Sequence, residues 1–213
     1  MRGAVVAVLA VCALLCAPAC SRSNDGTPTA ERTSTSVAPP AGTPPASAPG
    51  TSAPGVCAPV DPAPVQVRAE SSDPSAPTAT VGVPDGWSMA SAPDGARVDG
   101  PDGMWATVTI VAAAPEAEAA FRTYVEDLTA QAVVSTVSLL PGDVCGYSGQ
   151  KVMGMLTDGA DRVGSVQYRA RIVHVPSGGQ NYLVAVYVEA PVGTAGFDDA
   201  AALMTGDFEI ALP

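Results

Sequence analysis

Few side chains in this sequence belong to the types that carry out covalent catalysis. The candidate nucleophile is Ser148, within Gly146-Tyr147-Ser148-Gly149, and His174 is the only histidine available as its base. A nucleophile elbow needs one residue between the serine and the second glycine, at a turn from a strand into a helix. Gly149 instead follows Ser148 directly, at the predicted start of a strand. We therefore predict no catalytic residue and expect that the protein is not an enzyme.

Metal, cofactor and phosphate sites are not indicated either. One histidine and a pair of cysteines suited to a disulfide cannot complete a zinc site. Three Pro-Asp-Gly triplets, at 84–86, 93–95 and 101–103, lie close together, but none has the alternating Asp spacing and distal Glu of a calcium loop. They predict turns, because Pro fixes φ at the first turn position and Gly accepts a positive φ later. No glycine-rich strand-to-helix loop offers a phosphate site.

Cys20 is the thiol whose position indicates chemistry. Arg2 precedes an apolar run at 4–15, which is too short to span a bilayer, and small residues follow at 17–19. This layout predicts a signal peptide at 1–19, and a cysteine after a small residue suits a lipobox, in which the thiol receives a diacylglycerol. Residues 17–19 also fit an ordinary signal-peptidase site, which would leave a secreted protein. We predict a lipoprotein with acyl chains such as palmitate, anchored through Cys20 on the extracytoplasmic side of the cell membrane.

The count of cysteines supports this anchor. Of five cysteines, Cys12 and Cys16 leave with the signal peptide. Acylation of Cys20 leaves Cys57 and Cys145, an even number that predicts a disulfide in an oxidising compartment. Without acylation one of three thiols must stay unpaired. A free, buried Cys145 is the alternative, but Cys57 lies in a Pro-rich stretch that has nothing to bury it.

Composition separates the mature chain into two parts. Ser, Thr, Ala, Pro and Gly dominate residues 20–64, which cannot bury enough apolar surface to offset the entropy of ordering, so we predict a disordered stalk, either bare or with O-linked sugars. A net charge of −11 for the whole chain argues against nucleic acid and against electrostatic binding to anionic lipid. Residues 65–213 have the length of one globular domain.

The periodicity of this domain predicts an antiparallel sheet with helices packed on it. Alternating residues at 162–175 place Val166, Tyr168, Ala170 and Ile172 on one face and polar side chains on the other. The run 182–188 is apolar on both faces, which predicts a central strand covered on both sides. A helix should begin with Pro115 at its first position and bury a stripe through Phe121, Tyr124, Val125, Leu128 and Ala132. The remaining predicted elements are strands at 65–67, 79–83, 104–111, 133–140, 145–157 and 208–210, and a helix at 194–204. The fold class is α+β.

The order of these features resembles a known family. The run Val-Pro-Asp-Gly-Trp at 83–87 is followed by a strand, a helix, Gly-Tyr-Ser-Gly at 146–149, a Pro-x-Gly-Gly turn at 176–179 and a last helix that ends in Asp-Phe-Glu at 207–209. This pattern resembles the LpqN/LpqT-type lipoproteins of mycobacteria and related actinobacteria. The resemblance implies a PsbP-like α/β/α sandwich and a place in the cell envelope, beside glycolipids and lipid-export proteins.

Binding is the function that we expect from this sequence. Aromatic side chains stack on sugars and cover alkyl chains, and Tyr hydroxyls orient polar groups, although each aromatic residue on its own is better explained as core. We expect an envelope lipoprotein that binds an amphiphile resembling a glycolipid, or an envelope protein, with ligand residues unknown. The alternatives are a structural or immunogenic surface protein and, ranked below it, a hydrolase. The aromatic candidates are Trp87, Trp105, Tyr147, Tyr168, Tyr182 and Tyr187.

Overall fold

We describe the protein from a computed structural model, in residues 56–159 and 162–213. The predicted signal peptide, Cys20 and the predicted stalk up to residue 55 lie outside the described residues. Two helices, α1 (Ala117–Thr129) and α2 (Phe197–Met204), and a short 3₁₀ helix, η1 (Pro101–Gly103), accompany the strands. The strands are β1 (Val56–Cys57), β2 (Gln66–Ala69), β3 (Thr78–Gly82), β4 (Ser88–Ala92), β5 (Gly95–Asp99), β6 (Trp105–Ala112), β7 (Val134–Pro141), β8 (Gly149–Gly159), β9 (Arg162–Ser177), β10 (Gln180–Pro191) and β11 (Glu209–Ala211).

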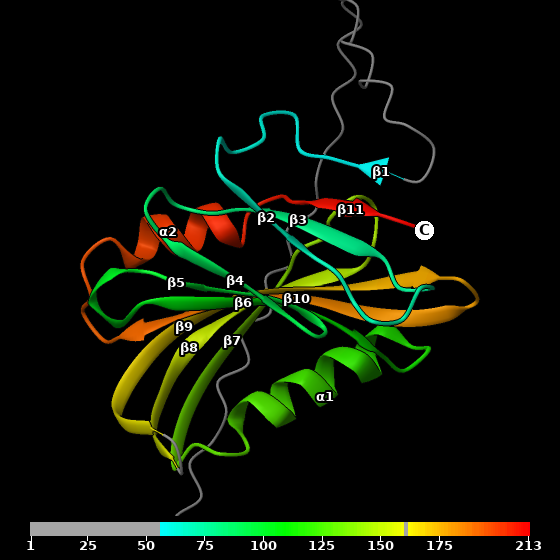
Figure 1. Ribbon diagram of the computed structural model, residues 1–213. Helices are drawn as coiled ribbons and strands as arrows, with labels where there is room; N and C mark the ends of the chain where they lie inside the picture. The colour runs from blue at the N-terminus through cyan, green and yellow to red at the C-terminus, as the bar shows by residue number, and fades with distance from the viewer. Residues whose placement is uncertain (1–55, 160–161) are drawn as a thin grey trace, which may run out of the picture. The chain divides into compact units, whose positions relative to one another are not determined.

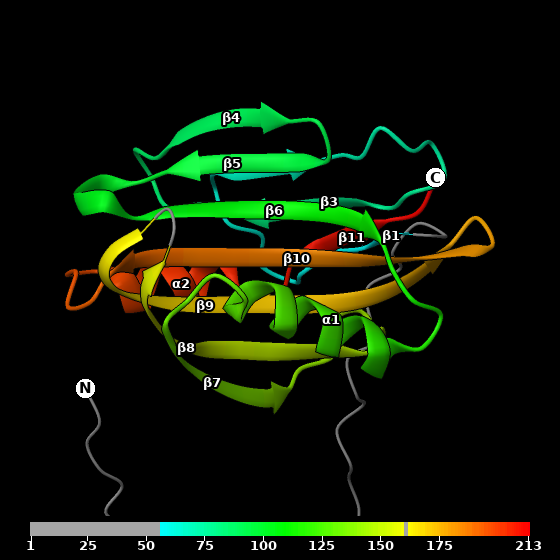
Figure 2. The same cartoon turned by 90° about the horizontal axis from the view of Figure 1, so that it is seen from below.

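A seven-stranded antiparallel sheet forms the middle of the described fold, in the order β4-β5-β6-β10-β9-β8-β7. Helix α1 lies on one face, across β8 and β9 (Figure 2). Helix α2 and a second, four-stranded sheet, in the order β1-β11-β3-β2, lie on the other face (Figure 1). The predicted α+β class, an antiparallel sheet with helices packed on it, is confirmed. The outer layer opposite α1 combines a helix with strands, where the family resemblance implied helices alone.

Strand β10 shows why this sheet is covered on both faces. Its even residues, among them Val184 and Val186, enter the core beneath α2 and the small sheet, whereas Leu183 and Ala185 enter the core beneath α1. All residues from Tyr182 to Ala190 are buried. The prediction of a central strand covered on both sides is therefore confirmed.

Strand β9 has the predicted alternation. Tyr168, Ala170 and Ile172 are buried on the α1 side, and Arg169 on the opposite face forms a 2.5 Å ion pair with Asp198 of α2. The ring of Tyr168 lies beside Gly154, its partner on β8, and its hydroxyl donates to the Thr136 carbonyl of β7 at 3.1 Å. A Cβ on Gly154 would lie 1.8 Å from that carbonyl oxygen, so the crossing requires glycine.

Both helices are shorter than predicted, for local backbone reasons. Pro115 does not open α1, because Glu116 follows it at the N-cap position in an extended conformation (φ −90°, ψ 122°). The left-handed Gly196 (φ 79°) delays the start of α2 until Phe197. The predicted apolar stripe of α1 does face the sheet: Phe121 is buried, and Tyr124, Val125 and Leu128 are half-buried against the core.

The structure adds strands that the sequence patterns did not predict. The hairpin of β4 and β5 turns at the middle Pro-Asp-Gly triplet, where Ala92 pairs with Gly95. Strand β1 pairs with β11, Val56 opposite Ala211 and Cys57 opposite Ile210. Strand β1 lies within the range predicted to be stalk, so the sheets include residues ahead of the predicted domain boundary at residue 65.

Candidate functional site

Cavities flank α1 on both of its long sides. A cavity of about 350 Å³ lies between α1 and the ends of β6 and β10. Two others, of about 320 and 300 Å³, lie between α1 and strands β7 and β8. The latter two share four lining residues, Glu118, Phe121, Leu139 and Gln150, and together form one depression, here called the α1–β7 groove.

The α1–β7 groove exists because α1 is loosely packed against the sheet. Only Ala120 and Phe121 of its thirteen residues are fully buried. Every residue of β7 is exposed. The apolar stripe of α1 therefore does not cover this strand. Phe121, Val125 and Leu139 supply apolar walls.

The polar groups of the groove are mostly hydrogen-bond acceptors. Glu118, Glu126 and Asp143 line it with a single basic residue, Arg122. The side-chain oxygen of Gln150 is buried without a hydrogen-bond partner among the described residues. An unpaired buried amide oxygen costs free energy, and a hydroxyl group in the groove would satisfy it.

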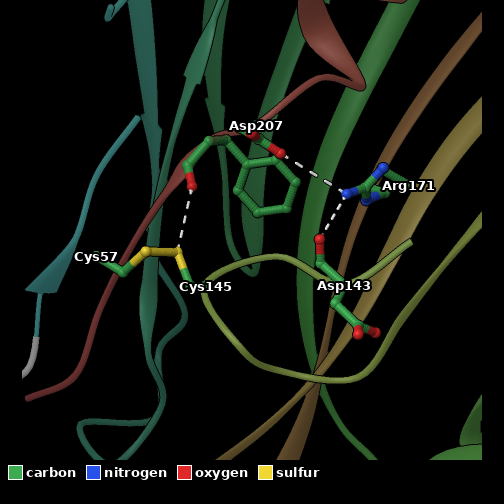
Figure 3. The surroundings of a disulfide bond; sticks show 6 residues. Cys57, Asp143, Cys145, Arg171 and Asp207 are labelled. Carbon is green, nitrogen blue, oxygen red and sulfur yellow. Dashed lines mark hydrogen bonds and ion pairs between the residues drawn. A yellow bond between two sulfur atoms is a disulfide. The ribbon is translucent and has the colours of Figure 1, made fainter. Parts of the chain in front are cut away.

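A turn at one end of the groove is held by the predicted disulfide. Val144 and Tyr147 exchange backbone hydrogen bonds of 3.2 and 2.9 Å, and the two residues between them, Cys145 (φ 60°) and Gly146 (φ 78°), are both left-handed, as in a type I′ turn. Cys145 is joined to Cys57, with Cα atoms 5.7 Å apart (Figure 3).

A buried arginine supports the same turn from below. Arg171, on β9, is 4% exposed and donates from Nη2 to the Asp143 carbonyl at 2.8 Å. Its nearest carboxylate, that of Asp207, lies 3.8 Å away (Figure 3). Burial lowers the pKa of Arg171, and the carboxylates of Asp207 and Asp143 oppose that shift. The Asp143 side chain in turn accepts the Gly149 N–H at 3.3 Å, so the turn is tied to β8 as well as to β9.

The cavity on the other flank of α1 has different chemistry. Small side chains dominate it, with Thr123, Tyr124 and Asp127 as its polar groups. Burial, and next the neighbouring Tyr168, raise the pKa of Tyr124, so its hydroxyl stays protonated. This cavity can take a small apolar group and has one charged side chain, that of Asp127, whereas the α1–β7 groove has four charged side chains.

Ser148 and His174 come close without forming a nucleophile–base pair. The backbone N–H of His174 donates to the backbone carbonyl of Ser148 at 2.9 Å, but no hydrogen bond joins the two side chains in the described structure. His174 Nε2 lies 2.9 Å from the Ala114 carbonyl, which can only accept, so this nitrogen carries the proton. His174 holds the segment ahead of α1 against the sheet.

The aromatic residues proposed from the sequence lie mainly in the cores. Trp87, Tyr168, Tyr182 and Tyr187 are each at most 8% exposed, and Trp105 and Tyr147 are half-buried. The cavities are lined instead by Phe121 and Tyr124 of α1. These two belonged to the predicted helix stripe, but no pattern in the sequence indicates that the stripe borders open space.

The described residues contain no cluster of side chains suited to a metal ion. In the same part of the chain, no helix has the length and hydropathy needed to cross a membrane.

The geometry of this fold has a counterpart among solved structures. The fold is similar to that of LpqN. The crystal structure of LpqN, involved in cell envelope biogenesis of Mycobacterium tuberculosis, aligns with a TM-score of 0.53, covering 69% of this chain and 91% of LpqN, at 17% sequence identity. No protein-family model and no curated protein matches the sequence. The likeness to LpqN therefore shows the fold, and the sequence-based resemblance pointed to the same fold.

Proposed function

We propose that the protein is a lipid-anchored, non-catalytic component of the cell envelope that binds an amphiphile with an uncharged, hydroxyl-bearing head group in the α1–β7 groove. The observation that carries the proposal is a groove with apolar walls in which the buried side-chain oxygen of Gln150 has no hydrogen-bond partner among the described residues. The likeness to LpqN, a protein of cell envelope biogenesis, supports the setting.

The groove explains this choice of ligand. An alkyl chain against Phe121, Val125 and Leu139 would gain about 0.8 kcal/mol for each buried methylene. The head group would meet Glu118, Asp143 and Gln150, which accept hydrogen bonds, and hydroxyl groups donate them. A phosphate head group would meet like charge there, so the groove favours a sugar or polyol over an anionic lipid.

The experiment compares two detergents that share an alkyl chain. Dodecyl maltoside and dodecyl phosphate, both below their critical micelle concentrations, are titrated into the full chain carrying Cys20→Ala, and binding is measured by calorimetry and native mass spectrometry. We expect the maltoside to bind at least tenfold more tightly. Equal affinity would contradict the assignment of the head group, and no binding of either would contradict the proposal.

A pair of variants locates the site. Leu139→Trp fills the groove from an exposed position on β7 and should weaken maltoside binding at least tenfold. Met155→Trp is the matched control, because Met155 is similarly exposed, at 42% against 48% for Leu139, and lines none of the three cavities beside α1. An equal loss in both variants would place the ligand elsewhere.

A further inference from the structure

Strand β7 is a sheet edge that pairs with no described strand on its outer side. It ends the seven-stranded sheet, and all eight of its residues pair with β8 in continuous register, from Val134 opposite Thr157 to Pro141 opposite Gln150. None of the eight carries a charge. Val134, Val137, Leu139 and Leu140 are 57%, 36%, 48% and 50% exposed. Proteins usually protect such an edge with charge, bulges or a covering element.

The other described sheet edges differ from β7. Strand β4 has five residues and β1 only two. Strand β2 carries Arg68, which is paired with Glu70 at 2.7 Å. Length, absence of charge and apolar exposure thus coincide at β7 alone among the described strands.

The backbone groups of β7 that have no partner strand in the described part of the chain define what can cover this edge. The Gly142 N–H donates to the Gly149 carbonyl, and antiparallel partners alternate between bonded and unbonded pairs. The groups of Ser135, Val137 and Leu139 therefore face the open edge. A lipid phase would leave them unpaired at a cost of several kcal/mol each, whereas another β-strand would pair them.

We propose that β7 pairs with β7 of a second copy, antiparallel, about a two-fold axis at Val137. This register sets Val137 against itself, Val134 against Leu140 and Ser135 against Leu139 of the second copy. In this register, residues whose backbone groups face the open edge of one copy lie opposite residues of the same kind in the other copy, so their N–H and C=O groups can pair. Side chains on the α1 face of both copies then lie on the same face of the joined sheet. The arrangement is closed, because it consumes both β7 edges.

Charge is consistent with contact at this strand. Each copy has a net charge of −11, so two copies approach at the least electrostatic cost where neither carries charge. One strand pair buries less than the roughly 1,200–2,000 Å² of a standard stable interface. We therefore expect a weak dimer that depends on concentration.

The pairing has a consequence for the α1–β7 groove. Leu139 lines this groove, and in the dimer Ser135 of the second copy would lie beside it. The two grooves would then face each other across the joined strands, on the same side of a continuous sheet. The dimer itself is argued from the strand alone and does not depend on the proposed ligand.

Cysteine cross-linking tests the axis directly. The full chain with Val137→Cys is exported in expressing cells, treated with a mild oxidant and analysed on non-reducing gels. Opposed residues of paired strands lie about 5.5 Å apart, within disulfide range, so we expect a dimer. Ser135→Cys is the control, because its two copies would lie about 14 Å apart and should stay monomeric. Equal cross-linking at both positions, or none at Val137, would overturn the proposal.

A charge variant tests the same strand by sedimentation of the full chain carrying Cys20→Ala. Val137→Lys places two like charges at the axis and should weaken dimerisation at least tenfold. Met89→Lys, at a 52% exposed position on the opposite edge strand β4, should leave it unchanged. A monomer at every concentration, or a Val137→Lys variant that loses only binding to lipid vesicles, would refute pairing with a second copy.

Discussion

The two faces of the central sheet differ in how closely the elements that cover them pack. The face beneath α2 and the four-stranded sheet, here called the packed face, includes fully buried Tyr182, Phe208 and Met204. The opposite face, here called the α1 face, is covered by a helix with two buried residues among thirteen. By contrast, α2 buries four of its eight residues. The difference indicates that α2 contributes more to the core for its length than α1 does, and that the cavities beside α1 follow from its looser packing.

The disulfide lies on the packed face, where Cys145 packs against the core, and its loss should have the largest effect on stability. Cys57 belongs to the four-stranded sheet, and Cys145 lies in the turn next to the groove. The bond joins residues 88 apart in sequence. In the chain-entropy model a loop of this size contributes roughly 4–5 kcal/mol, as an upper estimate.

The double variant Cys57→Ala, Cys145→Ala should therefore unfold at a much lower denaturant concentration than the parent chain. Reduction of the parent with a dithiol provides the control, since it should reproduce the loss without a change of side chain. A change below about 1 kcal/mol in both would show that β1 and the turn do not contribute to global stability.

Two phenylalanines of nearly equal burial, one on each face, allow the packing of the two faces to be compared by mutation. Phe208, on the packed face, is 1% exposed, and Phe121, on α1, is 6% exposed. Phe208→Ala should cost about 3–5 kcal/mol, because the surrounding core cannot collapse into the cavity. Phe121→Ala should cost less, about 2 kcal/mol, because Phe121 already borders open space on the groove side.

Chemical denaturation of both variants measures this difference. If Phe121→Ala destabilised the protein as much as Phe208→Ala, the contrast between the faces would be wrong. If it abolished binding of dodecyl maltoside while the protein stayed folded, the contrast would extend from packing to function.

The sequence predicted the packed parts of the molecule better than the open ones. The apolar run 182–188 and the alternation of β9 identified central strands, because burial on one or two faces leaves a clear period. The hairpin of β4 and β5 was missed, since Ser88–Ala92 contains small residues whose pattern does not alternate. Strand β1 has only two residues, within a Pro-rich segment, and local sequence gives no signal for a pairing with β11.

The α1–β7 groove depends on how closely α1 packs against the sheet, and no sequence pattern predicts that distance. Phe121 was correctly assigned to the inward stripe of its helix, but a stripe does not tell how closely the helix approaches the sheet. Gln150 had no signal at all, because the lack of a hydrogen-bond partner for its side-chain oxygen among the described residues is a property of the folded groove. The disulfide could be predicted by counting cysteines, because the predicted acylation of Cys20 leaves only Cys57 and Cys145.

The smallest expected effect concerns the hydrogen-bond acceptors of the tyrosine hydroxyl groups on the two faces. Tyr182 extends from the packed face and donates to the Asp73 carboxylate at 2.7 Å, whereas Tyr168, on the α1 face, donates to a backbone carbonyl. The hydrogen bond from Tyr182 lowers the pKa of Asp73, and the Ser75 N–H adds to that effect. The same bond raises the pKa of Tyr182.

The sign of the pH dependence follows from the lowered pKa. An ionised Asp73 stabilises the folded state above the ordinary pKa of a carboxyl group, and this contribution is lost as the pH falls through the lowered value. Tyr182→Phe should raise the pKa of Asp73 towards its ordinary value and reduce the part of the stability that disappears in acid. NMR titration of the Asp73 carboxyl group measures the shift. Tyr168→Phe, which removes a hydroxyl that bonds no carboxylate, should leave the pKa of Asp73 unchanged; a shift of equal size in both variants would show that general loosening of the fold, not the hydrogen bond, sets this pKa.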